Sequence, residues 1–158
     1  MRVTLKTDYA LRAMAHLAAA SDSGPVKADE IAQGQNIPLK FLLTIMRELK
    51  LAHLVRSQRG PDGGFVLHRS AQDITLADVI RAVDGPLANV HDTSLADLEY
   101  QGPAQGLKDV WMAVRVSLRS VLEAVTLADL VDGSLPDAVR ERAAAYERWM
   151  VRAESRDS

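Results

Sequence analysis

The hydrophobic and polar positions of the first 86 residues follow a helical period and then an extended one. Apolar residues recur at three- and four-residue steps over about residues 6–20, and a turn cluster at 21–25 ends that run. A short helix over about 28–33 follows, with Gly34 expected at its C′ position in the left-handed region. The next helix should begin near Pro38, a favoured first-turn residue. Its inward face is expected to hold Leu39, Leu42, Ile45, Met46 and Leu49.

Two short extended segments, about 54–58 and 65–68, flank a glycine-rich turn. Asp62-Gly63 is a strong hairpin signal, because the turn type that matches strand twist needs a positive φ. Thr75 is expected to cap a helix that ends near residue 84, with Asp78 completing a capping box. Helices followed by a basic hairpin are the layout of a winged helix-turn-helix domain, which sets one helix in the major groove of DNA and a basic loop beside it.

The periodicity fades over residues 87–103, which we interpret as a connector between residues 1–86 and a helical region over 104–158. Apolar residues at three- and four-residue steps then predict a helix over about 104–125, roughly 30 Å long. Because this helix is apolar along one side, we expect that side to pack on a partner helix. The expected dimerisation residues are Leu107, Val110, Trp111, Val114, Leu118, Val121 and Leu122.

A further turn begins at Thr126, and a last helix is expected from Pro136 to about residue 154. One face of that helix should carry Val139, Ala143, Tyr146 and Met150. The predicted fold is therefore mainly α, a winged helix-turn-helix domain with a small two-stranded β wing plus a long C-terminal dimerisation helix.

Composition removes several classes of function. The chain has no cysteine, which excludes disulfides, thiol redox switching, zinc fingers and cysteine-ligated iron–sulfur clusters. It has neither an apolar run of about 20 residues nor an N-terminal signal-peptide pattern, so we expect no membrane association and a cytoplasmic location. The sequence contains no nucleophile–base pair, no metal motif and no phosphate-cradling loop that would indicate an enzyme.

The charge is distributed unevenly, although the formal net charge is only −2. Residues 1–69 carry 10 Lys and Arg against 6 Asp and Glu, whereas residues 70–158 carry 9 against 15. A basic first half joined to an acidic second half suits a nucleic-acid surface attached to a partner-facing module. Ordinary fluctuation of surface charge explains the same numbers equally well.

Two motifs carry a resemblance to a known family: Arg59-Gly60-Pro61 followed by Gly63-Gly64, and the segment 74–86 from Ile-Thr to Gly-Pro. Further matches lie at residues 9–14, 30–32, 37–42, 54–55 and 126–130. Together they resemble the Rrf2 family of winged-helix repressors, which includes IscR, NsrR and CymR. The match covers nearly the whole chain in order. The resemblance implies a homodimer that crosses its long helices and reads a near-palindromic operator in double-stranded DNA.

The chain departs from the family in two respects. The family's sensors carry three cysteines in the connector, and residues 87–103 have none. Asp8 matches a position that supplies a non-cysteine ligand in some members, and Arg12 falls where another member uses histidine. One carboxylate without thiolates cannot hold such a cluster, so no cofactor is expected and Asp8 is interpreted as a helix-start residue. Asp62 replaces the family's usual glycine and should either weaken phosphate contact at the wing tip or tilt the loop.

The DNA surface is expected on the second helix of the motif and on the wing. Arg59 is the leading residue, because a wing arginine can enter a narrow minor groove. Lys40, Phe41 and Thr44 can reach base edges or a thymine methyl group. Arg47, Arg56 and Lys6 are assigned to phosphates. The full predicted set is Lys6, Leu39, Lys40, Phe41, Thr44, Arg47, Arg56, Ser57, Arg59, Gly60 and Pro61.

Two questions stay open at this point. The alternative function is a protein-interaction regulator that uses the winged domain to dock a partner protein, since CymR-like relatives work with an enzyme partner; exposed Phe41 and Leu43 are compatible with it. The signal sensed is also open: a small-molecule effector between the winged domain and the long helix, a protein partner, or none. His91 and Asp92 in the connector are either a ligand site or part of a solvated loop.

Overall fold

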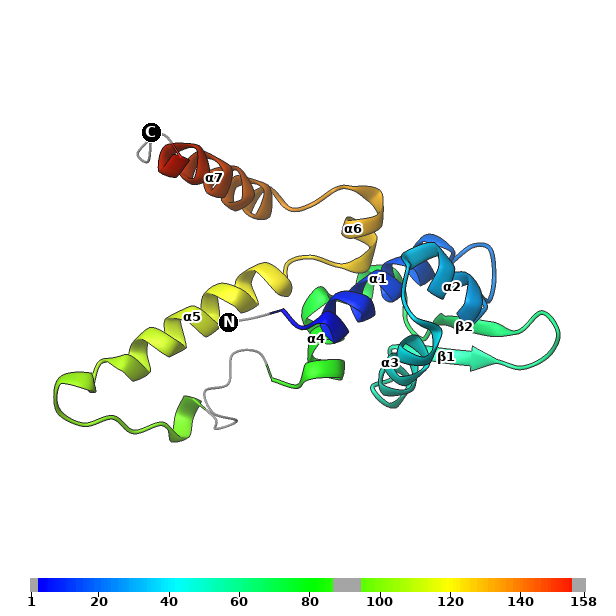
Figure 1. The fold of residues 1–158 in the computed structure, drawn as a ribbon, viewed down its shortest axis with the longest axis horizontal. Coiled ribbons are helices and arrows are strands. Elements are labelled where there is room, and N and C mark those ends of the chain that lie inside the picture. The colour runs from blue at the N-terminus through cyan, green and yellow to red at the C-terminus, as the bar shows by residue number, and fades with distance from the viewer. Residues whose placement is uncertain (1–2, 87–94, 155–158) are drawn as a thin grey trace.

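The computed structural model describes residues 3–86 and 95–154 (Figure 1). Residues 3–86, which we call the head, contain α1 (Leu5–Ala19), α2 (Ala28–Gln35), α3 (Leu39–Leu51), β1 (Val55–Gln58), β2 (Gly64–Leu67) and α4 (Leu76–Asp84). They are followed by α5 (Leu107–Leu122), α6 (Leu127–Asp132) and α7 (Asp137–Glu154). The fold is mainly helical with one two-stranded antiparallel sheet, as the sequence predicted. Among the described helices, none is long and apolar enough to cross a membrane.

α1 is the central element of the head. It packs against α2, α3, α4 and α6 and buries one stripe of its surface, at Ala10, Ala13, Met14 and Leu17. The alanines leave room for close approach of the surrounding helices, while Met14 and Leu17 fill the space between them. At its start, the Asp84 carboxylate accepts hydrogen bonds from the hydroxyls of Thr4 (2.8 Å) and Thr7 and ties α1 to the end of α4.

The turn between α2 and α3 differs from the sequence prediction. α2 continues through Gly34 to Gln35, and Asn36 adopts the left-handed conformation (φ 51°) that was expected of the glycine. Gly34 serves a different need, because a Cβ there would lie 2.7 Å from His16 Cε1. α3 then buries Leu42, Ile45, Met46 and Leu49 as predicted. Leu39 was also placed on the inward face and is 40% exposed, because it begins the helix at the rim of the core.

The wing is built from β1 and β2, which pair antiparallel from Val55↔Leu67 to Gln58↔Gly64. The expectation of a positive φ at Asp62-Gly63 is wrong: the left-handed residue is Gly60, with φ 111°. The loop closes when Gly63 N–H donates to the Gly60 carbonyl at 3.0 Å. Gly63 is needed for space instead, since a Cβ there would collide with the Gln58 carbonyl oxygen.

β2 is also anchored on its other edge. Val26 and Phe65 exchange two backbone hydrogen bonds, at 2.9 and 2.8 Å, in an isolated antiparallel bridge. Gly64 lies against this bridge, and a Cβ on it would collide with the Val26 carbonyl. The base of the wing is therefore fixed to the segment that leads into α2, while its tip stays exposed.

Two nearly identical pentapeptides begin α4 and α6. Residues 74–78 and 125–129 differ only at their first residue, Ile against Val. In each, the threonine caps its helix in a full capping box, as was predicted for Thr75 and Asp78. In the second box the backbone N–H and then the hydroxyl of Thr126 donate to the carboxylate of Asp129, and these bonds hold the Asp129 pKa below its usual value.

The two boxes meet at an antiparallel bridge between Thr75 and Thr126. Leu76 N–H donates to Val125 (3.0 Å) and Leu127 N–H donates to Ile74 (2.9 Å). This bridge returns the chain to the head after α5 and places Leu127, which is fully buried, in the head's own hydrophobic core. α6 therefore contributes to the stability of the head although it follows the long helix in sequence.

α5 and α7 extend away from the head (Figure 1). The helix predicted over 104–125 is shorter, from Leu107 to Leu122, because a 3-10 turn precedes it and Val125 is already in the bridge to the head. No residue of α5 is fully buried. On α7, Tyr146 of the predicted apolar face is 61% exposed, and the side chain of Met150 lies outside the described residues.

Candidate nucleic-acid interface

The outer face of α3 carries the residues that the sequence assigned to base contact. Lys40, Phe41 and Thr44 are all exposed, opposite the buried stripe of the same helix. The Thr44 hydroxyl donates to the Lys40 carbonyl at 3.3 Å, which leaves its oxygen free to accept and its methyl group at the surface. This face presents a cation, an aromatic ring and a methyl-bearing hydroxyl within about one helical turn.

Phe41 is held in place by α1. Its ring meets the ring of Tyr9 edge-to-face, with centroids 5.8 Å apart. The guanidinium of Arg12 lies 5.4 Å from the centre of the same Tyr9 ring, and it also pairs with the Asp8 carboxylate at 3.0 Å. Phe41 is 45% exposed, so α1 braces an aromatic side chain that the head leaves open to a partner.

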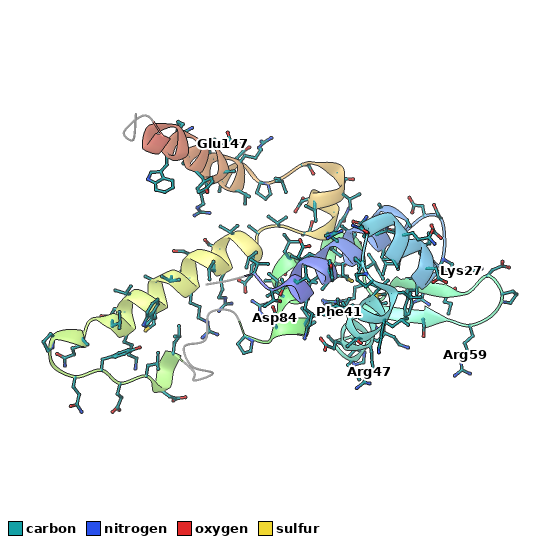
Figure 2. The ribbon with its side chains drawn as sticks, in the orientation of Figure 1. Lys27, Phe41, Arg47, Arg59, Asp84 and Glu147 are labelled. Atoms are coloured by element: carbon teal, nitrogen blue, oxygen red, sulfur yellow. The ribbon has the colours of Figure 1, made fainter. Side chains whose placement is uncertain are left out.

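Arginines on α3 and on the wing face the same way. Figure 2 shows the side chains of Arg47 and Arg59 pointing to one edge of the head. Arg47, Arg56, Arg59 and Lys40 are exposed and make no ion pair with any residue in 3–86 or 95–154. Since no described carboxylate pairs with these cations, their charge is available to phosphates.

Two predicted contacts are engaged within the head. Lys6 Nζ lies 3.0 Å from the Glu48 carboxylate of α3, so the phosphate contact predicted for Lys6 requires this ion pair to open. The Ser57 hydroxyl accepts a hydrogen bond of 2.9 Å from Lys50 Nζ. The sequence reasoning missed Lys50, although it follows Arg47 by three residues and so shares its side of α3.

The wing tip consists of Arg59, Gly60, Pro61 and Asp62, all exposed. Gly60 supplies the positive φ that lets the chain turn directly before Pro61. Asp62 makes no ion pair with another residue of the described chain. Its negative charge therefore lowers the positive potential around Arg59. Charge at this tip is therefore mixed.

The predicted dimerisation residues lie along α5 without being buried by their own chain. Leu107, Trp111, Val114, Leu118, Val121 and Leu122 are half-buried, and Val110 is 52% exposed. Val116, which was not predicted, is 66% exposed. The indole N–H of Trp111 is buried and has no acceptor among the described residues. The apolar face of α5 is thus only partly covered, and the Trp111 indole N–H lacks an acceptor in the described part of the chain.

The donor set does not fit a thiolate-ligated iron–sulfur cluster. The chain has no cysteine, and the Asp8 carboxylate is engaged by Arg12. Residues 3–86 and 95–154 hold no group of three or more His, Asp or Glu side chains that could ligate a metal ion. His91 and Asp92, considered above as a ligand site, lie outside the described residues.

Comparison with known proteins gives consistent matches. Residues 3–133 match the model of the Rrf2 family, described as an iron-dependent transcriptional regulator. A Mycobacterium tuberculosis protein named as an HTH-type transcriptional regulator, Rv1287, is 49% identical over 146 residues, which cover 92% of this chain and 91% of that protein. The HTH-type transcriptional regulator CymR of Bacillus subtilis is 35% identical over 130 residues, covering 82% of this chain and 89% of CymR.

Solved structures show the same fold. The structure of CymR, the global cysteine regulator of B. subtilis, superposes with a TM-score of 0.73 at 33% identity, covering 85% of this chain and 98% of that one. The structure of T. potens IscR gives a TM-score of 0.68 at 34% identity, covering 85% of this chain and 88% of that one. The family match over residues 3–133 takes in the head, α5 and α6.

Proposed function

The chain belongs to the Rrf2 family of transcriptional regulators, and from that premise we propose that it is a homodimeric, sequence-specific DNA-binding repressor that works without an iron–sulfur cluster. Family members of this kind are regulators of transcription rather than enzymes. The observation that carries the proposal is the set of unpaired cations on the outer face of α3 and on the wing, around the braced ring of Phe41.

In this proposal α3 is the recognition helix. Lys40, Phe41 and Thr44 read base edges and thymine methyl groups in the major groove. Arg59, with Gly60 and Pro61, enters the adjacent minor groove, while Arg47 and Arg56 contact phosphates and position the head. Leu39 and Ser57 border this surface, and Lys6 joins it when its ion pair with Glu48 opens.

The dimer is proposed from the incomplete face of α5. A second copy would cover the half-buried apolar residues and supply an acceptor to the Trp111 indole. Two heads related by a twofold axis would meet half-sites about one helical turn apart, so the operator is near-palindromic. We retain the division into a DNA-binding region (1–86), a connector (87–103) and a dimerisation region (104–158), acting in the cytoplasm.

The absence of a cluster is proposed from the donor set. With no thiolate in the chain and Asp8 paired to Arg12, the chemistry that holds iron and sulfide in cluster-bearing relatives has no counterpart here. The regulator then responds to a small-molecule effector, responds to a protein partner, or represses constitutively without a signal.

The function is tested by measuring the affinity of the full chain for labelled promoter duplexes, its own promoter among them, by fluorescence anisotropy. We expect one duplex to bind far more tightly than the others, and affinity to fall steeply with salt through counterion release. Arg140→Ala is the matched control, because this arginine pairs with Asp137 on α7, far from α3 and the wing. Equal affinity for every duplex would contradict the proposal.

The dimer is tested by light scattering. A particle of twice the 17.2 kDa chain mass is expected. Val110→Glu places a charge on the open face of α5 without removing buried packing and should shift the particle toward the monomer. Ala138→Glu adds the same charge to an exposed position of α7 as a control. A monomeric wild-type chain would contradict the dimer.

A second function is favoured by one specific feature of the head. A cavity of about 430 Å³ beside α3 is lined by Leu43, Met46, Arg47, Lys50, Leu51 and Phe65, and Leu51 is 72% exposed. An apolar hollow of this kind suits docking of a partner protein. A chain that shows no sequence preference on DNA but binds one stable partner, and loses that partner on Leu51→Ser, would favour this function.

A further inference from the structure

A second cavity, of about 430 Å³, lies where the end of α4 meets α5, and it is distinct from the α3 and wing surface. Its lining residues are Arg81, Gly85, Pro86, Arg115, Arg119 and Glu123. We propose that this cavity binds a small oxyanion, a molecule that presents carboxylate or phosphate groups. Its volume lies within the range of small-molecule sites, and three of its six lining residues are arginines.

Among the described lining residues, Glu123 supplies the single carboxylate, and that carboxylate is already shared. Glu123 accepts from Arg119, whose Nη2 lies 2.9 Å from Glu123 Oε1 and whose Nε lies 3.0 Å away, and it also accepts from Arg81 Nη2. These bonds, with that from Arg119 the larger cause, hold the pKa of Glu123 below its usual value. Arg81 has a further carboxylate partner in Asp78, at 3.4 Å. The carboxylates of Asp78 and Glu123 are thus paired with Arg81 and Arg119.

Arg115 has no ion-pair partner among the described residues. Its Nε is buried and makes no hydrogen bond to any described residue, and no carboxylate of residues 3–86 or 95–154 pairs with it. Burying a guanidinium donor without an acceptor is unfavourable, and folded proteins almost always satisfy such groups. Arg115 lines the cavity, and the described residues supply no anion to its guanidinium.

Stabilisation of helix ends does not account for Arg115. Arg81 and Arg119 lie in the last turns of α4 and α5, where a positive charge interacts favourably with the helix dipole. Arg115 lies roughly two turns before the end of α5, beyond the reach of that effect. A planar guanidinium binds carboxylate and phosphate oxygens through paired hydrogen bonds, which defines the chemistry of the missing acceptor.

This inference goes beyond the proposed function, because binding of an anion at the α4–α5 junction requires no DNA. It is tested by isothermal titration calorimetry of the full chain with two probes, citrate and pyrophosphate. We expect at least one probe to bind at one site per chain. Arg115→Gln should weaken that binding about ten-fold or more, since one charge-assisted interaction is lost. Arg140→Gln, which removes an arginine from α7, should leave the binding unchanged.

The stability of the variant is a second readout. Because Arg115 Nε has no partner among residues 3–86 and 95–154, Arg115→Gln should unfold thermally at or above the wild-type temperature when no probe is present. Should that variant fail to fold, Arg119→Gln takes its place with the same expected loss of binding. Binding of citrate alone identifies a polycarboxylate ligand, and binding of pyrophosphate alone identifies a phosphate ligand.

Three results overturn the proposal. The first is a wild-type chain that binds neither probe at millimolar concentration. The second is an Arg115→Gln variant that binds as tightly as wild type. The third is an Arg140→Gln variant whose binding is weakened as much as that of Arg115→Gln. The last result would mean that the probes respond to overall charge rather than to this cavity.

Discussion

Replacing Arg59 by alanine separates DNA recognition from folding. The side chain is exposed and forms no ion pair with the described residues, so its loss should change the free energy of unfolding by no more than about 0.5 kcal/mol. An arginine that contacts a base edge contributes roughly 1–3 kcal/mol to binding. The proposed homodimer would carry two such wings on half-sites about one helical turn of DNA apart, so the losses should add and binding should weaken by about 2–6 kcal/mol, at least about 30-fold.

The assay is fluorescence anisotropy on the preferred duplex and on an unrelated one, with urea unfolding of the same samples. Arg59→Ala should lose much more affinity for the preferred duplex than for the unrelated one, because a groove contact reads sequence or groove shape while a phosphate contact does not. Arg47→Ala is the comparison, and it should weaken both duplexes alike and lower the salt dependence. Equal losses on both duplexes for Arg59→Ala, or no loss, would refute the assignment of Arg59 to the groove.

Three further predictions concern the wing tip and the return of the chain to the head. Asp62→Asn removes the negative charge beside Arg59 and should tighten DNA binding by roughly two- to five-fold in low salt, an effect that disappears in high salt. Leu127→Ala should lower the free energy of unfolding by about 2–5 kcal/mol, whereas Leu130→Ala, 38% exposed on the same helix, should cost roughly 1 kcal/mol or less; both are measured by urea unfolding at one protein concentration. The bonds from Thr126 lower the Asp129 pKa, so their stabilisation is present above the ordinary aspartate pKa and is lost as the pH falls through the lowered value; Asp129→Asn should therefore give a less steep acid limb in plots of stability against pH. An unchanged acid limb would contradict that role.

Local signals in the sequence predicted much of the fold. The capping box at Thr75 and Asp78 lies where the pattern put it, because its partners are three residues apart and need nothing from the rest of the chain. The glycines were less predictable. Gly34 lies against the ring of His16, which is distant in sequence and would have to shift to admit a Cβ, and Gly64 is required by the backbone of Val26. A glycine selected for space looks the same in a sequence as one selected for positive φ.

The candidate site likewise has a part that local sequence signals predicted and a part that depends on contacts between distant residues. The amphipathic pattern of α3 placed Lys40, Phe41 and Thr44 on the surface, because a helical period fixes which side faces the core. It did not indicate that Tyr9 braces Phe41 or that Glu48 engages Lys6. Those contacts join α1 to α3 and depend on how the two helices cross. The cavity at Arg115 is of this kind too, since arginines from separate helices converge only in the folded chain.

The bridge between Thr75 and Thr126 has a consequence for how such regulators diversify. The chain leaves the head at one end of α4 and comes back at the other, so the whole excursion that carries α5 departs and returns across a single helix of nine residues. That separation is only about 13 Å, a gap that roughly four extended residues can span. Under the proposed function, a short loop in place of residues 87–124 should leave a head that folds without α5, and exchange of this segment between relatives should change the proposed dimer contacts while the α3 and wing surface stays the same.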